Sequence, residues 1–109
     1  MNIVNLVGHI ATDVTVKETK SHHLVCNFNM AVYDYKDTSF IPVTVWNKRA
    51  ENLEKYCKKG SKVAVSGYLK QDDYQNGEGI TYKHMIVIAS NIEYLSPKEK
   101  FENIDEINI

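Results

Sequence analysis

The sequence predicts an all-β domain built as a five-stranded Greek-key barrel, with one short helix between the third and fourth strands. Five segments have the apolar residues of strands, and the second, third and fourth of them show the two-residue period of a strand. A single segment with helical spacing follows the third of them, and an Asn-Gly pair, a strong hairpin signal, precedes the last. The 109 residues, of which 43% are hydrophobic and 25% charged, fit one globular domain.

The first two strands are expected over residues 2–10 and 24–33. The first is apolar along most of its length, and Gly8 suggests a bend or a bulge. The second alternates well, with Cys26, Phe28 and Met30 on one face and polar residues on the other. Residues 14–18, between the two, also alternate.

The third strand, over residues 39–46, has two apolar faces. Ile41, Val43 and Val45 fill the inward face, so Phe40 and Trp46 are expected on the outer face. From residue 50 to residue 59 the apolar spacing becomes helical, and Gly60 is expected to end this helix.

The last two strands are expected over residues 62–71 and 81–95. Val63, Val65 and Leu69 should point inward from the fourth strand, and the hairpin loop should span residues 72–79. The fifth strand is long enough to require a bulge or a bend. This order of elements is that of the OB fold, with residues 1–95 as the domain and residues 96–109 as a short acidic tail.

Net charge gives little guide to a partner, since it is only −1 at neutral pH. Residues 1–95 contain 11 Lys and Arg against 10 Asp and Glu, and residues 96–109 contain 2 against 4. Binding to phosphates would therefore depend on where the lysines lie, not on their number. The outer face of the third strand is more informative, because aromatics beside cations are typical of single-stranded nucleic-acid binding.

Other classes of function find little support. The sequence lacks a nucleophile elbow, a phosphate-binding loop and a carboxylate pair in an apolar setting, so we expect no enzyme and no cofactor. His22, His23, Cys26 and His84 match no standard ligand spacing, so we expect no metal. No apolar run reaches the roughly 20 residues of a membrane span, and no signal peptide is visible. We expect a cytoplasmic protein with two free thiols.

Several segments, taken in order, resemble one family. They are Met-Asn-x-Val-x-Leu-Val-Gly at the start, Asn-Phe-x-Met-Ala-Val, Phe-Ile-Pro-Val-x-Val-Trp-Asn-Lys-x-Ala-Glu-Asn, Tyr-x-Lys-Lys-Gly-Ser-x-Val-x-Val-x-Gly-x-Leu, a tyrosine-containing hairpin and a closing Ile-Glu-Tyr-Leu. From residue 1 to about residue 95 the chain resembles bacterial and phage-type single-stranded DNA-binding proteins of the SSB family. The resemblance implies sequence-independent binding and protection of single-stranded DNA in replication, recombination and repair, by a homotetramer of OB-fold subunits. It also implies a location in a bacterial cytosol or nucleoid, or in a phage-infected or plasmid-bearing cell.

The resemblance also implies two sets of binding residues. Bases would stack on Trp46, Phe40 and Tyr74, and on either Tyr33 or Tyr35 in the loop after the second strand. Phosphates would be contacted by Lys17, Lys48, Lys58, Lys59 and Lys70. The helix-end lysines, however, equally suit a solvated surface.

The chain departs from the family's pattern in several places. Asp72 and Asp73 stand where relatives usually have Arg or Lys, so replacing both with Lys is expected to tighten binding. The long linker is missing, and the acidic tip that would dock replication and recombination proteins is represented only by Asp105, Glu106, Ile107 and Ile109 with the asparagine between them.

Two alternatives remain open from the sequence. The first is an OB-fold protein-interaction module of a replication or recombination complex that touches DNA weakly. The second is a cold-shock-like RNA binder, but the sequence does not show the adjacent aromatics on neighbouring strands that are typical of that family. Salt-dependent binding to single-stranded DNA would separate the main hypothesis from the first alternative.

Overall fold

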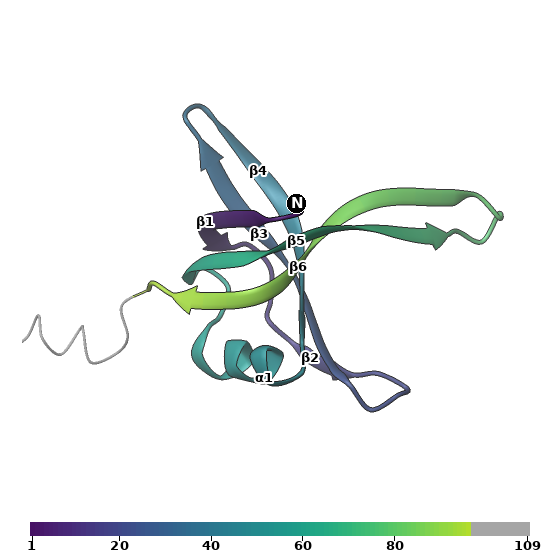
Figure 1. The fold of residues 1–109 in the computed structure, drawn as a ribbon, viewed down its shortest axis with the longest axis horizontal. Helices are drawn as coiled ribbons and strands as arrows, with labels where there is room; N and C mark the ends of the chain where they lie inside the picture. Colours follow the sequence, from purple (N-terminus) through teal and green to yellow (C-terminus); the bar gives the residue numbers. More distant parts are fainter. Residues whose placement is uncertain (97–109) are drawn as a thin grey trace, which may run out of the picture.

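The computed structural model describes residues 1–96, and this part of the chain forms six strands and one helix (Figure 1). The elements, in order, are β1 (Val4–Ile10), β2 (Val16–Glu18), β3 (Leu24–Asp34), β4 (Asp37–Trp46), α1 (Asn47–Tyr56), β5 (Lys62–Gln75) and β6 (Thr81–Tyr94). The three-residue β2 is additional to the five predicted strands and pairs with β3 alone.

Five strands close into a barrel in the order β1-β5-β6-β4-β3, and β3 returns to pair with β1. The strands pair antiparallel except for β4 and β6, which run parallel through Val43 opposite Val87 and Thr44 opposite Ile88. The helix lies between the third and fourth strands of this barrel, as the sequence predicted. The all-β OB fold is therefore confirmed.

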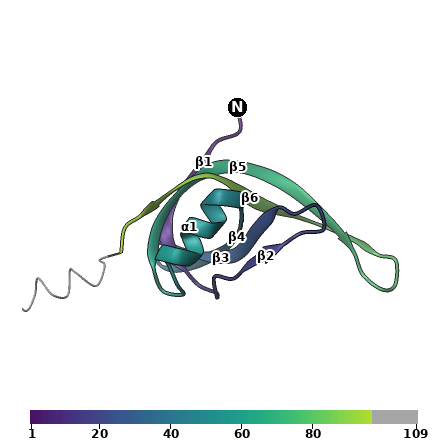
Figure 2. The ribbon, with the colours of Figure 1, turned by 90° about the horizontal axis from the view of Figure 1, so that it is seen from below.

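The core lies inside the barrel and is closed at one end by α1, as the view in Figure 2 shows. Ala50 and Leu53 of α1 are fully buried against strand residues that were predicted to point inward. These strand residues are Cys26, Phe28, Met30, Val43, Val45, Val63 and Val65. Because these residues already fill the core, the opposite face of β3 and β4 can carry polar and aromatic side chains.

Two glycines allow strands to approach one another closely where the barrel closes. A Cβ added at Gly8 would lie 2.1 Å from the carbonyl oxygen of Ala31, and one at Gly67 would lie 1.9 Å from that of Ile88. The pairing of β1 with β5 runs unbroken through Gly8, so the bulge suggested there is wrong. The bulge expected in the last strand is confirmed, because the β5–β6 register shifts between Ser66 and Gly67.

Three other expectations are corrected. The helix begins at Asn47 and ends at Tyr56, so Gly60 is not its end but a turn residue with φ of +98° further along. β5 continues through Gln75, so the hairpin loop is shorter than predicted and Tyr74 lies within a strand. Leu69 is 42% exposed instead of buried, because the pairing of β5 with β1 ends at Gly67 and the outer parts of β5 and β6 project from the barrel as a hairpin (Figure 1).

Candidate nucleic-acid interface

The outer face of β3 and β4 carries the two aromatics that the sequence singled out. In an antiparallel pair, residues directly opposite each other share a face. Trp46 lies opposite Val25, and Phe40 lies opposite Ala31. Phe40 is 62% exposed and Trp46 is 40% exposed, whereas Val43 and Val45 between them are buried. The two rings are separated by six residues of strand, or about 20 Å, with Pro42 and Thr44 between them.

At the Trp46 end, the neighbouring strands bring a cation onto the same face. Lys17 of β2 lies opposite Val25, which in turn lies opposite Trp46. Lys17 is therefore two strands from Trp46, about 10 Å across the sheet. Lys48, in the first turn of α1, is also exposed.

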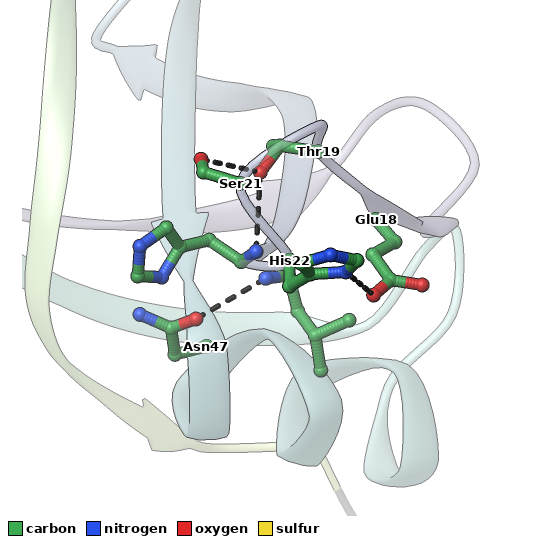
Figure 3. Close-up of polar contacts among 7 residues, drawn as sticks. Glu18, Thr19, Ser21, His22 and Asn47 are labelled. Atoms are coloured by element: carbon green, nitrogen blue, oxygen red, sulfur yellow. Dashed lines mark hydrogen bonds and ion pairs between the residues drawn. The ribbon is translucent and has the colours of Figure 1, made fainter.

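Polar contacts hold this end of the face in place (Figure 3). Asn47 has a left-handed φ of 56°, which asparagine tolerates, and it turns the chain from β4 into α1. Its side-chain Oδ1 accepts a 3.1 Å hydrogen bond from the Leu24 backbone N–H, beside the Trp46–Val25 pair. In the β2–β3 turn, Thr19 Oγ1 accepts a 3.1 Å bond from the His23 N–H. The backbone that follows Trp46 is thus held against the start of β3.

At the Phe40 end, predicted residues from separate segments line one hollow of about 410 Å³. Phe40 and Tyr33 contribute aromatic rings, and Lys59 contributes a cation from the loop before β5. His9, which the sequence did not single out, also lines this hollow and packs edge-on against Tyr33 with ring centroids 5.7 Å apart. Its position depends on the β1–β3 pairing that closes the barrel, so it has no signal in the local sequence.

The projecting hairpin carries a third aromatic group. The Tyr74 ring stacks on Tyr82, directly opposite on β6, with centroids 5.2 Å apart and an angle of 26° between the rings. His84 packs edge-on against Tyr74 at 5.9 Å. One face of the Tyr74 ring is thus already covered, and the two tyrosines together form an aromatic surface larger than either ring. Only the register of β5 with β6 shows that Tyr82 meets Tyr74.

Between these aromatic groups lies a hollow of about 330 Å³ that we call the polar hollow. Along β4 it occupies the stretch between Phe40 and Trp46, and it extends across to the base of the hairpin. Its polar lining consists of Thr12, Asn27, Asn29, Thr44, Asp72 and His84. Thr44 Oγ1 donates a 2.7 Å hydrogen bond to Asn27 Oδ1, and His84 Nε2 lies 3.6 Å from Asp72 Oδ2.

The remaining predicted residues are placed less centrally. Tyr35 lies at the β3–β4 turn with its side chain 96% exposed, and Lys36 Nζ lies 5.8 Å from the centre of its ring. The geometry therefore favours Tyr33 over Tyr35 as the partner of Phe40. Lys58 is exposed after α1, and Lys70 shares the hairpin face of Tyr74. The four tail residues from Asp105 to Ile109 lie outside the described residues.

Comparison with known proteins assigns the chain to a family. Residues 1–95 match the Single-strand binding protein family. The chain belongs to this family. Single-stranded DNA-binding protein B of Bacillus subtilis is 32% identical over 111 residues, which cover 95% of this chain and 98% of the relative. Single-stranded DNA-binding protein 1 of Clostridium acetobutylicum is 35% identical over 109 residues, covering 92% and 98%. The Single-stranded DNA-binding protein of Staphylococcus aureus strain MW2 is 32% identical over 114 residues, covering 98% and 73%.

The structure places Asp72 and Asp73 of this member of the single-strand binding protein family on opposite faces of the hairpin. Asp72 lies opposite His84, on the hairpin face of Tyr74. Asp73 lies opposite Lys83 on the other face, where its Oδ1 accepts a 3.1 Å hydrogen bond from Gln71 Nε2. Only Asp72 adjoins the polar hollow, and the weakening of phosphate contact by the two carboxylates remains a prediction.

The groups whose pKa is shifted lie away from the outer face of β3 and β4. Burial raises the pKa of the Cys26 and Cys57 thiols, and it also raises the pKa of the Tyr94 phenol. All three groups therefore stay neutral at neutral pH and add no negative charge. Within residues 1–96, no three His, Cys, Asp or Glu side chains are grouped as metal ligands would be. No helix in that stretch is long and apolar enough to cross a membrane.

Proposed function

We propose that this protein binds single-stranded DNA without strong sequence preference and so protects exposed strands during replication, recombination and repair. The observation that carries the proposal is the outer face, on which Trp46, Phe40 and the Tyr74–Tyr82 pair are exposed. Every base has a flat face that can stack on such rings, so this mode of binding tolerates any sequence. Membership of the single-strand binding protein family supports the same function.

The charges suit a strand that runs along this face. Lys17 and Lys48 would contact phosphates at the Trp46 end, and Lys59 would do so at the Phe40 end. Lys70 shares the face of Tyr74 on the hairpin, and Lys58 follows α1. The domain charge is close to zero, so attraction to DNA would come from these local positions and would weaken with salt.

Other properties of the proposed binder rest on family membership alone. We infer a binding role with no catalytic step, a domain that spans residues 1–95 and a homotetrameric assembly. We also infer a cytoplasmic location in a bacterial or phage-infected cell. Docking of replication or recombination proteins on the tail remains a prediction.

The function can be tested by the fluorescence of the single tryptophan. We expect oligo-dT to quench Trp46 strongly, because a stacked base covers a ring that is 40% exposed, and we expect the quenching to weaken as salt increases. Absence of both quenching and a gel shift would instead favour a protein-interaction module. A gel shift without quenching would keep the function but move the site away from β4.

The hairpin charge gives a second test of the same binding mode. Asp72→Lys is expected to tighten binding of oligo-dT, because it replaces an anion with a cation beside the hollow. A new phosphate contact would steepen the slope of log affinity against log salt by about 0.7.

Asp73→Lys is the matched control for this change in charge, since Asp73 lies on the opposite face of the hairpin. It should change the affinity much less than Asp72→Lys. Equal gains from the two variants would indicate a long-range charge effect and no strand path along the Tyr74 face.

A further inference from the structure

The polar hollow contains an acidic group where stacking and phosphate contact require none. We propose that it receives one nucleobase edge-on, and that Asp72 makes it prefer bases with an exocyclic amino group, such as cytosine or adenine, over thymine or uracil, which have none. This inference rests on the proposed binding of single-stranded DNA. It makes Asp72 a residue that sets a base preference within an otherwise sequence-tolerant interface.

The position of the hollow is the first argument. It lies between Phe40 and Trp46 along β4 and adjoins the Tyr74–His84 contact of the hairpin. A strand that stacks on rings at both ends of β4 would pass over it. Its volume of about 330 Å³ is at the small end of ligand pockets, which suits a base better than a longer ligand.

The hydrogen-bonding groups of the hollow are the second argument. Thr44 Oγ1 donates its hydrogen bond to the Oδ1 of Asn27. Within residues 1–96, the amide NH₂ of Asn27 has no hydrogen-bond partner. In the same stretch, the side-chain amide of Asn29 makes no hydrogen bond. Such amides can donate to the ring nitrogens and carbonyls of a base edge.

The chemistry of Asp72 supplies the preference. An ionised carboxylate only accepts hydrogen bonds, so where it faces position 4 of a pyrimidine it can pair with the N4 amino group of cytosine but not with O4 of uracil or thymine. The carboxylate is about half exposed, and His84 Nε2 lies 3.6 Å from Oδ2, which leaves Oδ1 available to a ligand. A phosphate in the hollow would be repelled by the same charge.

The test compares oligo-dC with oligo-dU of equal length, because these pyrimidines differ at position 4 and in the proton on N3. Dissociation constants would be measured by anisotropy of labelled oligonucleotides for the full chain, Asp72→Asn and Asp73→Asn. An asparagine at position 72 can either accept or donate, so it should pair with both bases. We expect the ratio of the dissociation constant for oligo-dU to that for oligo-dC to be about fivefold larger for the natural chain than for Asp72→Asn.

Asp73→Asn is the control and should keep the ratio of the natural chain, since it removes the same charge from the opposite face of the hairpin. If Asp72→Asn tightens both oligonucleotides by the same factor, Asp72 only repels phosphates and the base preference is refuted. Tight binding with the same dU-to-dC ratio of dissociation constants in all three proteins would also overturn the inference, while leaving the proposed function intact. Failure to bind either oligonucleotide overturns both.

Discussion

Trp46→Ala is expected to weaken the binding of oligo-dT by about 1–3 kcal/mol, or roughly 5- to 150-fold in the dissociation constant. Trp46 is the largest ring on the outer face, and its backbone is held by the pairing with Val25 and by the Asn47–Leu24 hydrogen bond. Little entropy would therefore be lost when a base stacks on it. Since this variant lacks the fluorescent reporter, anisotropy of a labelled oligonucleotide would measure the affinity.

Two controls separate stacking from folding in this experiment. Trp46→Phe keeps an aromatic ring and should retain a large part of the affinity. A thermal melt should show that Trp46→Ala remains folded, because the side chain is 40% exposed and outside the core cluster. A folded alanine variant with unchanged affinity would contradict the stacking role.

Gly67→Ala is expected to destabilise the domain by about 3 kcal/mol or more, at the upper end of the cost of overpacking. The added Cβ would lie 1.9 Å from the carbonyl oxygen of Ile88, a backbone atom that cannot move without disturbing the β5–β6 pairing. For a domain of this size, such a loss would lower the melting temperature by about 10 °C or more. Circular dichroism during heating would measure it.

Gly77→Ala is the matched control for this substitution. A Cβ at Gly77, in the hairpin loop, would meet no atom within 4 Å, and its φ is not positive. The melting temperature of this variant should stay close to that of the natural chain. A stable Gly67→Ala protein would show that the two strands can separate at the bulge without loss of the fold.

Periodicity predicted the barrel well because each of its strands buries one face. Val43 and Val45 point inward and Trp46 outward, because the pleat of β4 leaves no other arrangement once the core is filled. The same reasoning failed at Leu69. Alternation cannot reveal that β5 has lost its neighbour β1 at this point, since the end of that pairing at Gly67 depends on the register between the two strands.

The site was predictable residue by residue but not as an arrangement. Phe40, Tyr33 and Lys59 were each expected to contact DNA, but their common hollow results from pairing across three segments. Likewise, the opposite orientations of Asp72 and Asp73 required the hairpin to be a strand at that point and not a loop. Stacking and phosphate contact by these residues remain predictions.

Along the hairpin, side chains alternate between the two faces, so an even or odd residue number tells which face a side chain lies on. Beyond the bulge, even-numbered residues of β5 and β6 share one side, which includes Lys70, Asp72, Tyr74, Tyr82 and His84. Even-numbered residues of β4, from Phe40 to Trp46, form the outer face as well. Odd-numbered positions of the hairpin, such as 71, 73 and 83, face the other way. The two sides can therefore be altered independently, so a second binding surface could be engineered on the odd side without touching the even one.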